Sequence, residues 1–134
     1  MKFKASVEQT SQAAGPVPTL MACLLHSVTG AHILHLQSRS YSEHQALGAY
    51  YSEVGDLVDA FIEAYQGKYS IIDNYPAEYV SPAAGAIAYL QYLEAEVETL
   101  RRANGFPQDS ELQNEVDNIA NLINSTLYKL RFLK

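Results

Sequence analysis

The sequence has no tryptophan, two methionines and a single cysteine, Cys23, among its 134 residues. One cysteine cannot form a disulfide within the chain, so a reducing compartment is the default expectation. Only 18% of the residues are charged, and 9 Lys and Arg stand against 15 Asp and Glu, which gives a formal net charge of −6. So acidic a chain lacks the basic surface typical of nucleic-acid-binding proteins, and DNA is not an expected partner.

Long apolar runs are missing as well. No stretch approaches the roughly 20 consecutive apolar residues that a membrane span needs. The start, Met1-Lys2-Phe3-Lys4, leads into polar residues and not into the apolar core of a signal peptide. We therefore expect no membrane association and a cytoplasmic location. Glycine-rich phosphate loops and the Ser/His/Asp patterns of nucleophilic enzymes are also absent from the sequence.

Helical periodicity is what the sequence does contain. Apolar residues recur at three- and four-residue steps in four segments, and no strand pattern competes with them. The first segment runs from Thr19 to about Ser38. The second opens at Ser42, which forms a capping box with Gln45, and ends at Gly67 in an expected left-handed conformation.

The third and fourth helical segments have start signals of their own. Ser81 followed by Pro82 is typical of a cap with proline at the first helical position, and that helix is expected to stop around Asn104. Ser110 with Gln113 resembles another capping box and predicts the start of the last helix.

The connections between these segments predict the fold class. Residues 67–80 lack a clear period and predict a long crossover between helices 2 and 3, whereas tight turns join the helices of each pair. This is the ferritin-like arrangement of an all-α, antiparallel four-helix bundle. Residues 1–16 are expected to form a flexible N-terminal arm, and residues 17–134 a single domain.

Histidines on the first helix are the first candidate metal ligands. His32 and His35 fall on the arc of its apolar residues, and His26 falls on the opposite, solvated face. Imidazoles on an apolar stripe are more often core residues than metal ligands. These histidines alone therefore do not define a site.

A polar stripe on the second helix is more informative. Asp59 and Glu63 are four residues apart, so both carboxylates share one helical face. Two glycines interrupt the helix on this face, each at a cost of about 1 kcal/mol relative to alanine. The stripe is either a solvated flank with two incidental glycines or an interface with a neighbouring chain, bordered by metal ligands. Its members are His44, Gly48, Ser52, Gly55, Asp59 and Glu63.

Helix geometry restricts how these residues could meet. Asp59 lies about 22 Å along the helix axis from His44, at 1.5 Å per residue. His32 is expected close to His44 across the turn, so one chain cannot bring both histidines onto both carboxylates. Two chains packed antiparallel about a two-fold axis can. Two imidazoles and two carboxylates suit iron, with zinc or no metal as the alternatives.

The residues from His32 to Gly67 resemble the Dps-type mini-ferritins, which oxidise iron at subunit interfaces. The family's ferroxidase centre has two histidines twelve residues apart, an aspartate fifteen further on and a glutamate four beyond that. Those intervals fall on His32, His44, Asp59 and Glu63. The resemblance implies a ferritin-superfamily protein that takes up Fe(II), oxidises it with peroxide or oxygen, and assembles through two-fold dimers into a hollow dodecamer.

The sequence also departs from the family pattern. Ile33 stands where the family has tryptophan, and Gly48 stands where it has a further carboxylate. Metal binding is therefore expected more firmly than catalysis, and His35 is an additional candidate ligand. The alternative is a non-catalytic oligomeric bundle with a structural or interaction role. The second half of the chain is similar to small phage-encoded helical proteins, in agreement with that alternative.

Overall fold

The computed structural model describes residues 14–82 and 84–134. The predicted N-terminal arm therefore lies largely outside the described residues. Of its last three residues, Ala14 is buried and Pro16 is already the first residue of a helix.

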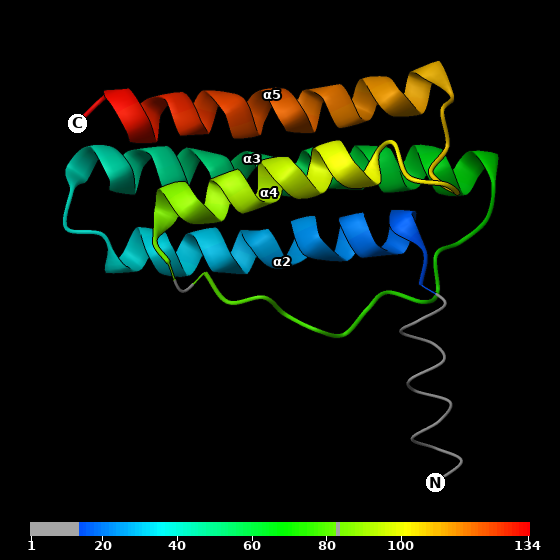
Figure 1. Ribbon diagram of the computed structural model, residues 1–134, viewed down its shortest axis with the longest axis horizontal. Coiled ribbons are helices and arrows are strands. Elements are labelled where there is room, and N and C mark those ends of the chain that lie inside the picture. Colours follow the sequence, from blue (N-terminus) through cyan, green and yellow to red (C-terminus); the bar gives the residue numbers. More distant parts are fainter. Residues whose placement is uncertain (1–13, 83) are drawn as a thin grey trace, which may run out of the picture.

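Four helices make up the described part of the chain, which contains no strand. Helices α2 (Pro16–Gln37) and α3 (Tyr41–Lys68) form one antiparallel pair, and α4 (Ala86–Leu100) and α5 (Ser110–Phe132) form the second. The segment after α3 runs back beside α2, so α4 starts at the end of the molecule where α3 also starts (Figure 1). The prediction of an all-α four-helix bundle is confirmed.

The helices enclose one core. Helix α3 packs against α2 and α5, and α4 packs against the same two helices, so α2 and α5 lie diagonally opposite each other. Every helix contributes fully buried aliphatic or aromatic side chains to the centre, as the periodicity predicts. The largest of these are Leu20, Met21, Leu24, Leu47, Tyr50, Phe61, Leu90, Leu93, Leu112, Ile119 and Ile123.

Helix α3 begins and ends differently from the prediction. Its N-cap is Ser40, whose hydroxyl accepts a hydrogen bond from the Glu43 backbone N–H at 3.3 Å, so the capping box predicted at Ser42 is wrong. Gly67 does not adopt a left-handed conformation, and the helix continues to Lys68. The side chain that caps α3 thus lies two residues earlier than the one chosen from sequence.

Helix α4 is shorter than predicted. It begins at Ala86 after Gly85, whose φ of 94° is a conformation that other residues adopt only with strain, so the predicted start at Ser81-Pro82 is wrong. It ends at Leu100 and not near Asn104. The chain beyond the helix turns toward the core and buries Phe106, which is 4% exposed.

The turn between α4 and α5 is closed by side-chain hydrogen bonds. The Gln113 amide donates to the carbonyls of Arg101 and Pro107 and accepts from the Arg101 guanidinium. Gln113 therefore does not complete a capping box with Ser110, which is already the first helical residue after Asp109.

A group of charged side chains links the end of α3 to the start of α5. Lys68 pairs with Asp109 at 2.7 Å and with Glu111 at 3.0 Å, and the Tyr69 hydroxyl donates to Asp109. The hydrogen bonds from Lys68 hold the pKa of both carboxyl groups below their usual values. The stabilisation that these ion pairs give to the folded state is present at neutral pH and is lost as the pH falls through the lowered pKa values of the two carboxyl groups.

Helix α2 is long and apolar, and we therefore compared it with the requirements of a membrane-spanning helix. By length and composition alone it could cross a membrane, so the expectation that no stretch approaches that length is too strict. Half of its most apolar window is buried inside the bundle. A core helix of a bundle passes the same test, so the finding is weak evidence for a span.

Helices α2 and α4 approach closely at a glycine. A Cβ built on Gly30 would lie 2.5 Å from the hydroxyl oxygen of Tyr89 and 2.9 Å from the ring carbon that carries it. Tyr89 is 5% exposed. Gly30 therefore provides the space that the tyrosine ring occupies between the two helices.

This contact gives a matched pair of stability predictions. Gly30→Ala is expected to lower the free energy of unfolding by about 1–3 kcal/mol, because the new methyl group overpacks against Tyr89. Gly55→Ala in α3 is the control, since nothing lies within 4 Å of its Cβ. It is expected to raise stability by about 1 kcal/mol through helix propensity. Urea unfolding followed by circular dichroism measures both, and equal effects of the two variants would contradict the packing argument.

Candidate functional site

Three histidines and a tyrosine gather where α2 meets α3. The rings of His35 and His44 stack with centroids 3.5 Å apart and an interplanar angle of 18°. His32 stacks on Tyr51 at 4.3 Å. His35 is half-buried, whereas His32 is exposed, so the expectation that both face the core is wrong for His32. It is therefore His35 and not His32 that stacks on His44.

His35 and His44 are bound to each other's backbone. The Nδ1 atom of His35 lies 2.6 Å from the carbonyl oxygen of His44, and the Nδ1 atom of His44 lies 2.8 Å from the carbonyl oxygen of His35. A carbonyl oxygen can only accept, so Nδ1 carries the hydrogen in both rings. In the neutral imidazole the lone pair is then on Nε2. A backbone carbonyl commonly orients metal-binding histidines in this way.

Both Nε2 atoms are accessible. No hydrogen bond to Nε2 of His35 or His44 is formed within residues 14–82 and 84–134. Within the same residues, no buried side-chain nitrogen or oxygen lacks a hydrogen-bond partner. The two Nε2 atoms therefore reach solvent, where they could bind a metal ion.

One of the two glycines on the α3 stripe has a role within the chain. A Cβ on Gly48 would lie 3.1 and 3.3 Å from two atoms of the His35 ring, so this glycine makes room for the imidazole. Gly55 has nothing within 4 Å of its Cβ. Close packing by a neighbouring chain is thus not needed to account for Gly48, and it remains an interpretation for Gly55.

The two carboxylates lie apart from the histidines, as the helix geometry requires. Asp59 and Glu63 are exposed on α3 and enter no ion pair with the described residues. No group of three or more His, Cys, Asp or Glu side chains that could hold a metal ion occurs in the described part of the chain. Any metal site that uses both the histidines and these carboxylates must therefore include a second copy.

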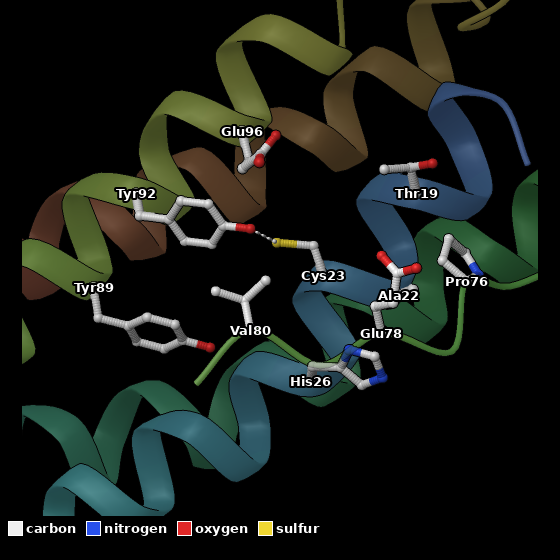
Figure 2. Close-up of a pocket in the computed structure, with 10 residues that line it drawn as sticks. All are labelled: Thr19, Ala22, Cys23, His26, Pro76, Glu78, Val80, Tyr89, Tyr92 and Glu96. Carbon is white, nitrogen blue, oxygen red and sulfur yellow. Dashed lines mark hydrogen bonds between the residues drawn. The ribbon is translucent and has the colours of Figure 1, made fainter. Parts of the chain in front are cut away.

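A separate cavity, which the sequence reasoning missed, lies between α2, α4 and the segment that follows α3 (Figure 2). Cys23 is half-buried in its wall, and its thiol donates to the Tyr92 hydroxyl over 3.9 Å. Burial raises the pKa of Cys23 to about 11, so the thiol stays protonated at neutral pH. His26 lines the same cavity and packs edge-on against Tyr79 at 5.6 Å, so it is not simply solvated.

The lining explains why the cavity escaped sequence analysis. Cys23 and His26 are three residues apart on one helical face, which is a weak local signal. Thr19 and Ala22 line the cavity from the same helix, whereas the other side chains come from two segments distant in the sequence, which no periodicity brings together. These other side chains are Pro76, Glu78, Val80, Tyr89, Tyr92 and Glu96.

These observations define the protein as a four-helix bundle with a histidine cluster at one end. The chain belongs to a family of unknown function, DUF5856, whose model matches residues 35–130. The match includes the whole of α3, with His44, Asp59 and Glu63, but begins beyond His32. No curated protein and no solved structure matches the chain.

The histidine geometry predicts the tautomers. In their neutral forms, the imidazoles of His35 and His44 are expected to carry their hydrogen on Nδ1, because both Nδ1 atoms donate to carbonyls. Long-range ¹H–¹⁵N correlation spectra distinguish protonated from unprotonated ring nitrogens. His32, which makes no such bond to the described residues, is the internal control. A hydrogen on Nε2 of either stacked ring would contradict the arrangement.

Proposed function

We propose that two copies of this protein bind a divalent metal ion, iron in the first instance, at an interface formed by their α2–α3 pairs. The observation that carries the proposal is the tautomer of His44, with Nδ1–H held by a carbonyl and Nε2 free. Zinc is the alternative metal, since two imidazoles and two carboxylates suit either ion.

An antiparallel pair supplies the ligands that one chain keeps apart. His32 and His44 of one copy would face Asp59 and Glu63 of the other, and the two-fold axis would generate a second identical site. Exposure of His32, Asp59 and Glu63 supports this arrangement, because ligands shared between copies must lie at the surface of each.

His35 lies beside the position at which the Dps-type proteins have a further metal ligand. Its ring occupies the space next to Gly48, the position at which the Dps-type proteins have a carboxylate. We propose that the imidazole of His35 takes the place of that carboxylate beside the site. A neutral ligand compensates less positive charge than a carboxylate does. We therefore expect one metal ion to be bound more firmly than a second.

Ferroxidase activity is the enzymatic part of the proposal. Each Fe(II), as the substrate, would lose one electron. Two such ions with two protons would reduce one hydrogen peroxide to two water molecules, or four ions with four protons would reduce one oxygen molecule to two water molecules, and the Fe(III) would be sequestered. The path of the chain after α3 supports a ferritin-like bundle, because it lets α4 run parallel to α3 (Figure 1). A larger two-fold-based assembly such as a dodecamer, a cytoplasmic location and the absence of DNA as a partner belong to the same proposal.

Subunit complementation tests the shared site directly. One variant carries His32→Ala with His44→Gln, and the other carries Asp59→Ala with Glu63→Ala. Each alone is expected to lose at least tenfold in Fe(II) or Co(II) affinity. The two variants are then mixed, dissociated and allowed to reassociate. Each mixed pair is expected to regain one metal site, because it holds one intact set of ligands.

The control and the contrary outcome follow from the same geometry. Glu53→Ala with Asp56→Ala removes two other exposed carboxylates of α3 and is expected to leave the affinity unchanged. Unchanged affinity in the Asp59 and Glu63 variant would remove the proposed site. Loss in both variants without recovery in the mixture would exclude sharing between copies.

The second candidate function is that of an oligomeric bundle without metal chemistry. Exposed apolar side chains and cations at the end of the molecule where α5 stops favour it. Leu36, Tyr41, Phe132 and Leu133 are exposed there. Four cations near this end form no ion pair within the described residues, whereas Lys68, Arg101 and Arg102 elsewhere all do. The four are Arg39, Lys129, Arg131 and Lys134.

The charges suggest a second copy as the partner for that end. The exposed carboxylates of α3 provide the complementary surface, and apolar side chains ringed by charge are typical of contact surfaces. Leu36→Asp with Phe132→Asp is expected to shift the metal-free protein toward the monomer in light scattering. Ile71→Asp, at an exposed apolar residue of the segment after α3, is the control. An unchanged particle mass in the double variant would contradict this candidate.

A further inference from the structure

The cavity beside Cys23 has the size of a small organic molecule. It has a volume of about 140 Å³ and lies between α2, α4 and the segment that follows α3 (Figure 2). A cavity of about 150 Å³ holds a molecule the size of benzene. A ligand of about six non-hydrogen atoms therefore fits.

The charged side chains that line the cavity indicate the charge of the ligand. Glu96 lines the cavity from α4, and Glu78, which is exposed, lines it from the segment after α3 (Figure 2). Neither carboxylate forms an ion pair within the described residues, and no Lys or Arg lines the cavity. His26 is the only basic side chain of the lining. Two carboxylates without a Lys or Arg partner favour a cation over an anion.

Aromatic side chains form another part of the wall. The rings of Tyr89 and Tyr92 stand 6.2 Å apart at an interplanar angle of 22°, and both side chains line the cavity. Tyrosine rings attract cations through their faces and also offer apolar surface to an alkyl chain. The thiol of Cys23 is protonated and hydrogen-bonded to Tyr92, so it adds no charge of its own.

We propose that this cavity binds a small organic cation, an alkylammonium of about six non-hydrogen atoms, with its ammonium group at one of the two carboxylates, Glu78 or Glu96, and its alkyl chain against the tyrosines. The ammonium group could belong to a free amine or to a lysine side chain of a partner protein. The cavity shares no residue with the histidine cluster, so the proposal stands or falls apart from the metal site.

Cys23 is a built-in reporter for occupancy, because it is the only cysteine in the chain. We expect n-butylammonium chloride to slow the reaction of Cys23 with a disulfide reagent at least fivefold at saturation. At the same concentration and ionic strength, n-butanol and sodium butyrate are expected to leave the rate unchanged. Amide shifts of Ala22 and Glu78 in ¹H–¹⁵N spectra during the same titration measure binding without relying on the thiol.

Variants locate the charge. Glu78→Gln with Glu96→Gln is expected to abolish the protection, with circular dichroism confirming that the fold is kept. Glu94→Gln is the matched control, since Glu94 is on the same helix but does not line this cavity. A capped Gly-Lys-Gly peptide distinguishes the sources. Protection by the peptide as well as by butylammonium indicates a lysine side chain, and protection by butylammonium alone indicates a free amine.

Three results would overturn the proposal. The first is equal protection by n-butanol, which would make the cavity an apolar site indifferent to charge. The second is protection that persists in the Glu78 and Glu96 variant. The third is the absence of both protection and amide shifts in the intact protein at high butylammonium concentration.

Discussion

Helix α3 packs against both α2 and α5, so its apolar stripe joins one helix pair to the other. The side chains of this stripe are completely buried, and each contributes about 1.5–3 kcal/mol of transfer free energy. They are Leu47, Tyr50, Val54, Val58 and Phe61. The one polar atom in the stripe is satisfied, because the Tyr50 hydroxyl hydrogen-bonds to that of Ser27 at 2.7 Å, and Ser27 donates to the Leu24 carbonyl.

The buried face of α3 also determines what its other face presents. Once Val54 and Val58 point inward, the helical repeat places Asp59 and Glu63 at the surface. At the start of the same helix, packing against α2 brings His44 onto His35. The histidines and carboxylates are therefore rigidly separated within a chain, and only association of copies could join them.

Periodicity predicted the number and core residues of the helices because burial repeats along each helix. It predicted the ends poorly, because several serines suited the role of cap. Ser40 was preferred to Ser42 in the fold, and Gly85 began α4 where Ser81 was expected. The residue at which each helix begins depends on how the neighbouring chain packs onto the core, and local sequence patterns carry no information about that packing.

The candidate sites, like the helices, were predictable only where the pattern lies within one helix. The polar stripe of α3 was visible in the sequence, since its members lie on one helix. The stacking of His35 on His44 and the space that Gly48 leaves for it depend on how two helices pack, and were not foreseen. The cavity beside Cys23 was missed because three segments far apart in the chain must assemble before it exists.

The connection from α3 to α4 has a consequence for how the bundle assembles. Each helix pair is local in sequence and can form early, whereas docking the pairs requires closure of the loop between them. The connection contributes Ile72 to the core but is otherwise largely exposed. Cutting it would remove few contacts and would turn docking into a bimolecular reaction. The two pairs could then recombine as separate fragments, with a stability that depends on their concentration.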